Sequence, residues 1–139
     1  MNEILDSFDS QKPNTPKERH GCVTVWLVLM IISNGLIALS YLFFGNTIAD
    51  FLPNESNTIY IIMLGLIAIL NIIFAIMILQ WKKMGFFGFV ATSIAALFLN
   101  SLLGLDLLQS LLGLSGIAIL YGILQIKGKN GNSAWSGMD

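Results

Sequence analysis

Long apolar runs separated by short polar breaks are the main pattern of this chain. Residues 22–44 and 58–81 hold no charged side chain over 23 and 24 positions, and a third apolar run covers residues 86–126. A helix of about 20 apolar residues spans the roughly 30 Å hydrocarbon core of a bilayer. The third run has 41 residues, with turn residues in its middle at "NSLLGLD", and so predicts two helices. Four membrane-spanning helices are expected, at about 22–44, 58–81, 86–103 and 107–126.

The polar segments between and around these runs complete the organisation. Residues 1–21 form a polar N-terminal tail, too long and followed by too long an apolar run for a cleaved signal peptide. Residues 45–57 are rich in turn formers and predict a short interfacial helix that ends before Pro53. Residues 127–139 form a second polar tail. We expect Asp106 to be the N-cap of the last helix, and the alternative is a bent or re-entrant pair that does not cross fully.

The composition supports a membrane protein. Hydrophobic residues make up 55% of the chain and charged residues 11%, whereas soluble proteins average about 25% charged residues. A soluble chain of 139 residues could not bury so much apolar surface in one core. The net charge of -1 argues against nucleic acid as a partner. The single cysteine and single histidine exclude an intrachain disulfide and a metal site with several such ligands.

The distribution of charge predicts the orientation of the four helices. All seven basic residues fall in the tails or in the turn after residue 81, which lie on one side of a four-span chain. The other side carries Asp50, Glu55 and Asp106 and no basic residue. By the positive-inside rule both termini are cytoplasmic, and we expect a bacterial inner membrane.

The turn "QWKKMGFFGF" raises the question of whether Lys82 and Lys83 bind a specific anion or only anchor the chain. A topological anchor is the simpler interpretation, with Gly85 permitting the reversal and contact with anionic lipid headgroups. In the second tail, Trp135 is expected to lie in the membrane interface or to dock on a partner. The predicted interface and topology anchors are Trp81, Lys82, Lys83, Lys127 and Lys129.

Each predicted helix carries a polar residue near the membrane midplane. At the usual helical rise, Asn34 and Ser115 lie about 18 Å deep and Asn71 about 16 Å deep. Thr92 and Ser93 lie somewhat shallower. These five residues form a candidate polar layer, whose functional interpretation is a binding or permeation site between helices. The simpler interpretation, which we prefer, is hydrogen bonding that fixes how the helices pack.

Small residues at helical spacing predict close packing between the helices. Three of the four helices carry such a stripe. The stripes are Gly65, Ala68, Ile72 and Ala75 in the second helix, Gly88, Thr92 and Ala96 in the third, and Ala118 and Gly122 in the fourth.

The same residues exclude several kinds of chemistry. No ionisable side chain lies within a predicted span, which argues against proton-coupled antiporters, including the small multidrug-resistance type with its essential Glu. Thiol-oxidising four-helix proteins need cysteine pairs, and intramembrane proteases need a serine with a base or two carboxylates. We therefore expect no enzymatic activity, no catalytic residues, no cofactor and no metal.

Two segments together resemble a known family. "LQWKKMGFFGF" and "ILYGILQIKGKNGNSAW" resemble the W-K-K-x-G-F-type turn and G-x-S-A-W-type tail of small uncharacterised four-span bacterial membrane proteins. The resemblance covers roughly residues 20–136 and implies an integral membrane protein of unknown role. It carries over no functional residues.

These observations lead to an all-α expectation: an integral membrane antiparallel four-helix bundle over residues 22–126, with both ends in the cytoplasm. The expected role is a non-enzymatic accessory, scaffold or immunity-like component. It would contact membrane lipids and another membrane protein or a second copy of itself. The alternative is a small oligomeric channel or carrier for a neutral or lipidic solute. A carrier needs Asn34 and Asn71 to face a cavity, whereas a scaffold needs them paired.

Overall fold

The computed structural model describes residues 19–52 and 58–139, apart from the side chains of residues 107, 109, 112 and 113. Most of the predicted N-terminal tail, residues 1–18, and the second part of the predicted 45–57 connection, residues 53–57, lie outside the described residues. In these ranges the chain is helical, with one isolated bridge between Lys127 and Ser133. The elements are α2 (Gly21–Asp50), α3 (Thr58–Leu79), α4 (Lys83–Leu102), α5 (Leu107–Leu124) and the short 3-10 helix η1 (Trp135–Gly137).

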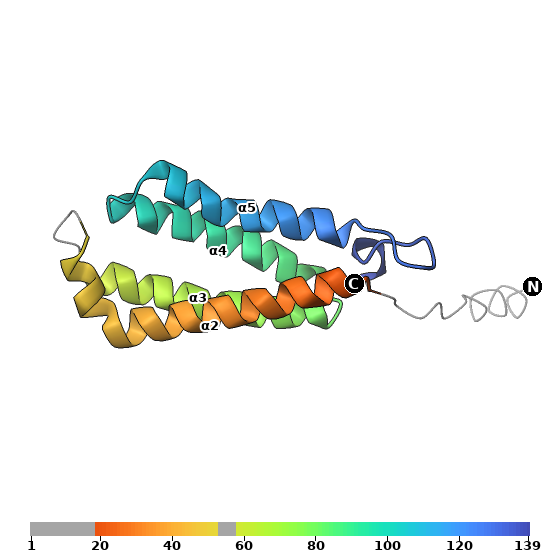
Figure 1. Ribbon diagram of the computed structural model, residues 1–139, viewed down its shortest axis with the longest axis horizontal. Helices are drawn as coiled ribbons and strands as arrows, with labels where there is room; N and C mark the ends of the chain where they lie inside the picture. Colours follow the sequence, from red (N-terminus) through yellow and green to blue (C-terminus); the bar gives the residue numbers. More distant parts are fainter. Residues whose placement is uncertain (1–18, 53–57) are drawn as a thin grey trace, which may run out of the picture.

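The four long helices lie side by side, and successive helices run in opposite directions (Figure 1). Helix α3 packs against both α2 and α4, while α5 packs against α4 and also contacts α2. The start of α2, the α3–α4 turn and the C-terminal segment therefore meet at one end. We call this the basic end, because the described basic residues lie in these segments: Arg19, Lys82, Lys83, Lys127 and Lys129.

Helix α2 is longer than predicted and contains a kink. The backbone of Phe44 is non-helical (φ -115°, ψ 17°), at the residue where the sequence predicts the helix to end, yet the helix resumes and continues to Asp50. Ile48 and Ala49 pack against a buried cluster that includes Ile61, and this tertiary contact outweighs the turn-forming tendency of the segment. Residues 45–50, in the first part of the predicted break at 45–57, are therefore helical, and the short helix predicted to end before Pro53 is the second part of α2.

The turn between α3 and α4 is formed by Trp81 and not by Gly85. Trp81 has a left-handed backbone (φ 66°), and the amides of Trp81 and Lys82 donate to the carbonyls of Ile78 and Met77, 3.0 Å away in both cases. This is the Schellman arrangement that ends many helices, in which glycine usually takes the left-handed position. The predicted role of Gly85 in the reversal is wrong, because Gly85 lies in the first turn of α4.

Gly85 and Gly88 instead allow α3 and α4 to approach closely. A Cβ at Gly85 would lie 2.5 Å from the carbonyl oxygen of Phe74, and a Cβ at Gly88 would overlap the Phe74 ring. In α3, Gly65, Ala68 and Ala75 of the predicted stripe are buried. The stripe predicted in the last helix does not pack within the described chain: Ala118 and Gly122 of α5 are both exposed.

Apolar residues form two buried clusters, one toward each end. The cluster near the basic end joins all four helices and the C-terminal segment, through residues such as Leu27, Phe89 and Leu120. The cluster near the opposite end includes Ile61, Leu64, Leu99 and Leu103. The core is therefore not one continuous apolar block.

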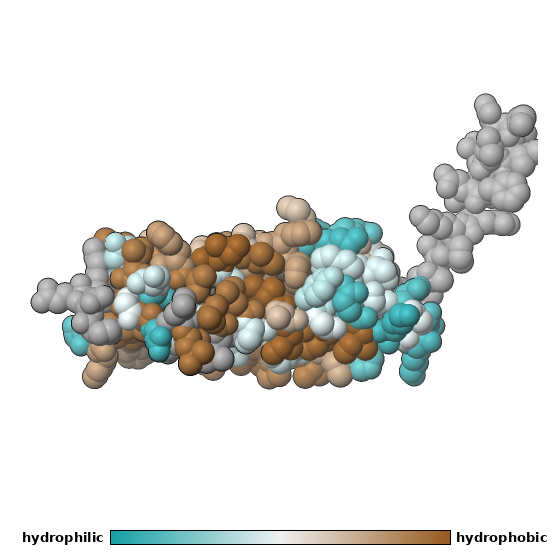
Figure 2. Space-filling view, turned by 90° about the horizontal axis from the view of Figure 1, so that it is seen from above, coloured by the Kyte–Doolittle hydropathy of each residue, from teal (hydrophilic) through white to brown (hydrophobic). Residues whose placement is uncertain are grey.

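Helices α2, α3 and α4 are each long and apolar enough to cross a membrane, and α5 contributes a shorter apolar stretch at Leu114–Leu124. Large apolar side chains cover the outside; Phe43 and Phe98, for example, are 76% and 66% exposed. Figure 2 shows this apolar surface, which gives way to polar residues at the basic end. The surface is what a chain in contact with lipid requires, since soluble proteins rarely expose large apolar patches.

Candidate functional site

Three residues of the predicted polar layer meet between the helices. Asn71 of α3 donates from Nδ2 to Oδ1 of Asn34 on α2, at 3.2 Å, and its own Oδ1 accepts from Oγ1 of Thr92 on α4, at 2.5 Å. Asn34 Nδ2 then donates to the carbonyl oxygen of Met30, at 2.8 Å. The result is a directed set of hydrogen bonds, from α4 through α3 to α2. We call Asn34, Asn71 and Thr92 the polar triad.

The close approach of α3 and α4 makes the Thr92 contact possible. The Phe74 ring occupies the space left by the missing side chain of Gly88 and contacts Phe89, with ring centroids 6.4 Å apart. Thr92, one turn after Gly88, is buried. Its hydroxyl also lies 3.0 Å and 3.1 Å from the carbonyls of Gly88 and Phe89. Because a hydroxyl has one proton, these carbonyls compete with Asn71 for it.

The two remaining residues of the predicted layer have different positions. Ser93 lines a cavity next to the polar triad. Ser115 is exposed on α5 and does not line this cavity. Equal depth in the sequence pattern is therefore not enough to bring a residue into the layer, because the rotation of each helix decides which face its polar residue occupies.

The cavity has a volume of about 280 Å³ and is lined by residues of all four helices. It runs from the polar triad toward the opposite end of the molecule, where residues near the second apolar cluster line it. Sequence reasoning missed Asn100, which belongs to the stretch that reads as turn chemistry, and Ser110, which lies near the start of the last predicted helix and far from the midplane. The polar side chains of its lining are Asn34, Tyr41, Asn71, Ser93, Asn100 and Ser110.

Several of these polar groups have unused hydrogen-bonding capacity. Each asparagine amide carries two N–H groups, of which Asn34 and Asn71 each use one in the bonds described above. The side chains of Tyr41, Ser93 and Asn100 form no hydrogen bond within the described chain. Among the described lining residues none is Asp, Glu, Lys, Arg or His. The described part of the lining thus offers neutral hydrogen-bond donors and acceptors.

A second hollow of about 340 Å³ adjoins the cavity. Its described lining is mainly apolar and comes from α4 and the α4–α5 region. Leu97 and Ser110 line both the cavity and this hollow, which we call the apolar groove. Ser110 is 6% exposed, and its hydroxyl donates to the carbonyl oxygen of Asp106 at 3.3 Å. Asp106 is the N-cap of α5, as predicted, although its side chain makes no capping hydrogen bond.

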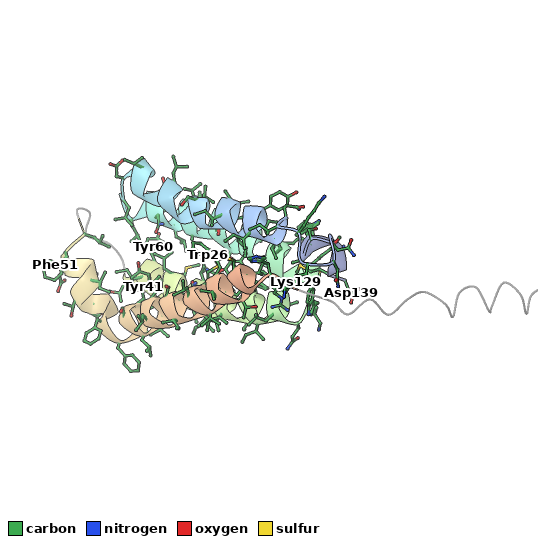
Figure 3. All side chains as sticks on the ribbon, turned by 45° about the vertical axis from the view of Figure 1, so that its right-hand side comes forward. Trp26, Tyr41, Phe51, Tyr60, Lys129 and Asp139 are labelled. Carbon is green, nitrogen blue, oxygen red and sulfur yellow. The ribbon has the colours of Figure 1, made fainter. Side chains whose placement is uncertain are left out.

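The C-terminal segment docks on the basic end and does not extend away from it. The amide of Asp139 donates to the carbonyl of Trp81, at 2.8 Å, and the carbonyl of Asp139 accepts from the amide of Lys83, at 2.7 Å. Ala134 and Met138 are buried. Figure 3 shows Lys129 and Asp139 at this end, away from Tyr41, Phe51 and Tyr60. All five predicted anchors therefore lie at one end of the molecule.

Trp135 docks on the chain's own helices, an outcome that neither sequence-based alternative anticipated. Its ring centroid lies 5.2 Å from that of Phe86 and 5.6 Å from that of Tyr121, both in edge-on geometry. Such aromatic pairs stabilise by roughly 0.5–1.5 kcal/mol beyond the area that they bury. No periodicity signals this contact, because a short 3-10 helix in a polar tail carries no apolar repeat.

Arg19 fastens the start of α2 to the same region. Its guanidinium lies 4.5 Å from the centroid of the Trp81 ring and donates to the carbonyl of Leu79, at 2.6 Å. Burial lowers the pKa of Arg19. The group remains charged at neutral pH, because the guanidinium is the most basic of the side-chain groups. Next to it, His20 caps α2 by accepting the amide of Cys22 at 3.3 Å, which fits the expected helix start.

No three residues of the His, Cys, Asp and Glu types within residues 19–52 and 58–139 are grouped to hold a metal ion. Comparisons with protein-family models, curated proteins and solved structures found no match.

Proposed function

We propose that the protein is an integral membrane protein with four spans, in which α2 to α5 form an antiparallel bundle. The support is the length and apolar character of α2, α3 and α4 and the apolar outer surface. We include α5 because it lies beside α4 and joins the same two ends; its 18 residues reach about 27 Å. The turn and tail that resemble small four-span bacterial membrane proteins are consistent with this proposal.

The basic end is proposed to face the cytoplasm of a bacterial cell. Lys82, Lys83, Lys127 and Lys129 lie there, whereas the opposite end carries Asp50 and Asp106. Cytoplasmic loops are rich in Lys and Arg, and anionic lipids attract each of them by about 1 kcal/mol near the membrane surface. Both termini are then cytoplasmic, and the inner membrane is the expected location.

As its function we propose a non-enzymatic accessory, scaffold or immunity-like component that acts through helix contacts. The pairing within the polar triad carries this proposal, because Asn34, Asn71 and Thr92 direct hydrogen bonds at one another across three helices. Interhelical hydrogen bonds fix the register and rotation of helices in lipid. A fixed arrangement presents constant outer faces to lipid and to a second membrane protein or a second copy.

Cross-linking in native membranes tests this role. With Cys22 replaced, single cysteines at Phe98 on α4 and Ile69 on α3 would report contacts of two exposed faces. We expect one of the two to cross-link to a partner or to a second copy, identified by mass spectrometry. The same scan is extended to exposed positions on α2 and α5. If no cysteine on any of the four helices cross-links, the accessory and scaffold proposal is overturned.

A second function, a small channel or carrier for a neutral or lipidic solute, is favoured by one observation. Asn34 and Asn71 are paired with each other but also line the cavity, which has no ionisable group among its described lining residues. Ligand sites typically occupy roughly 300–1,000 Å³, so the cavity is near the lower limit for a small solute.

Swelling of proteoliposomes in glycerol checks a permeation role: faster swelling than in empty liposomes is expected, and equal rates would contradict it.

A further inference from the structure

We propose that the cavity and the apolar groove together bind one uncharged amphiphile, a glycerolipid with free hydroxyl groups of the monoacylglycerol or diacylglycerol class. Its head would lie in the cavity between the polar triad and Asn100, and an acyl chain would follow the apolar groove past Phe98. The inference rests on the second proposed function and names the class of solute that the same site takes.

Unused polar groups in an apolar setting point to a polar ligand group. Asn100 and Ser93 line the cavity without a hydrogen bond to the described chain, and Asn71 keeps one free N–H. All three side chains are half-buried, so their polar atoms remain accessible to a ligand that enters the cavity. Hydroxyl and ester groups of a glycerol head supply both donors and acceptors for amides and hydroxyls.

The charge around the cavity selects an uncharged head. No cationic side chain is present in the described lining to bind a phosphate, and the end toward which the cavity runs carries Asp50 and Asp106. Their carboxylates disfavour an anionic head, since like charges repel. A cationic head would need a carboxylate in the lining, and the described lining has none.

The apolar groove supplies the place for the chain. Leu97 and Ser110 line both hollows, so a ligand whose head fills the cavity continues directly into the groove. Ile94, Phe98 and Leu105 provide an apolar wall there. A cavity with several polar side chains and an adjoining apolar groove match the two parts of an amphiphile. Lipid is also the solvent that the exposed apolar surface requires, so the ligand reaches the site from the bilayer.

Native mass spectrometry of the full-length protein tests the inference, with 1-monooleoylglycerol as the probe. The protein is released from phosphatidylcholine nanodiscs that contain the probe, and bound lipid is counted from the mass. We expect one monooleoylglycerol per chain, and no comparable retention of phosphatidylglycerol or oleate. Preferential retention of either anionic lipid would overturn the uncharged-head assignment.

Two leucine-to-tryptophan variants locate the site. Leu97→Trp fills the junction of the cavity and the groove, and we expect at least about a tenfold loss of apparent affinity, or about 1.4 kcal/mol. Leu102→Trp is the matched control, because Leu102 is exposed on the same helix and lines neither hollow. We expect it to change affinity by no more than about twofold. Equal losses in both variants would contradict this location.

A polar variant separates the head contact from filling of space. Asn100→Leu keeps the number and branching of the side-chain heavy atoms and removes the amide, so we expect about a fivefold weaker retention of monooleoylglycerol. Unchanged retention would overturn the assigned position of the head. Absence of the adduct from folded, membrane-integrated wild-type protein would overturn this inference alone. Failure of the protein to integrate into membranes would instead overturn the proposed membrane function.

Discussion

Trp81 has a strained backbone conformation and connects three separate parts of the chain. Its left-handed backbone (φ 66°) ends α3, its ring stacks on Arg19, and its carbonyl accepts from Asp139. A left-handed conformation costs a residue with a Cβ about 1–2 kcal/mol, so glycine would be the easier choice for the turn alone. The ring contacts explain why a tryptophan can occupy the position: they connect the start of α2 and the C-terminal segment to the α3–α4 turn.

Replacing Trp81 by alanine and by glycine separates these two contributions. Both variants lose the contact of the ring with Arg19 and its packing against the buried cluster near the basic end, and we expect each to be destabilised by about 2 kcal/mol. Trp81→Gly should be more stable than Trp81→Ala by about 1 kcal/mol, because glycine adopts a positive φ without a Cβ clash. Unfolding in sodium dodecyl sulfate, followed by circular dichroism, measures both values. A glycine variant no more stable than the alanine variant would show that the turn is unstrained.

Coupling within the polar triad is measurable by a double-mutant cycle. Asn34→Ala and Asn71→Ala each remove one partner of the 3.2 Å hydrogen bond, and the double variant removes both. We expect an interaction energy of about 0.6 kcal/mol, the average for interhelical hydrogen bonds in membranes, with about 1.7 as the upper limit. The same unfolding assay in detergent provides the four stabilities. Additive losses would indicate that the two amides act independently and that pairing does not hold α2 against α3.

At the scale of the helices, glycines determine how closely α3 and α4 approach. Gly85→Ala should destabilise by about 2 kcal/mol, since its Cβ would meet the backbone carbonyl of Phe74. Gly122→Ala is the matched control on α5, where the described chain places nothing within 4 Å of a Cβ, and we expect it to stabilise by up to about 1 kcal/mol. Thermal unfolding of the two purified variants measures both changes in stability. A neutral Gly85→Ala would mean that the two helices can move apart without loss.

The sequence predicts the helices better than it predicts how they end. Apolar runs located all four, because a charge-free run of about 20 residues has few other solutions in lipid. The continuation of α2 beyond Phe44 and the start of α4 at Lys83 depend on tertiary contacts, which periodicity does not report. For the site, depth along each apolar run correctly identified Asn34, Asn71 and Thr92 as neighbours. The rotation of the helices, which depth does not report, places Ser115 outside the cavity and Asn100 in its lining. Nothing in the hydrophobic pattern predicts that the C-terminal segment docks on the helices.

At the scale of the whole molecule, two apolar clusters enclose the polar triad and the cavity, and charge distinguishes the two ends. The cluster near the basic end includes the C-terminal segment, so that end is closed by packed aromatic residues. The cavity instead runs toward the end that carries Asp50 and Asp106. The molecule is therefore asymmetric across the proposed membrane. Its orientation decides which face of the membrane lies nearer the cavity.

Reporter fusions and a transfer of lysines together test that orientation. Alkaline phosphatase is active only outside the cytoplasm, so we expect activity when it is fused after Asp106 and none when it is fused after Lys129. Activity at the second position would reverse the proposed orientation.

Substituting Lys82 and Lys83 by glutamine and inserting two lysines into the 45–57 connection moves the positive charge to the other side of the membrane. Each lysine is attracted to anionic lipid by about 1 kcal/mol, so this transfer should make a fraction of the molecules insert in the opposite direction. The Asp106 fusion would then lose activity in proportion. If its activity stays constant, the lysines do not set the orientation, and the packing of the C-terminal segment on the α3–α4 turn becomes the better explanation of why this end stays inside.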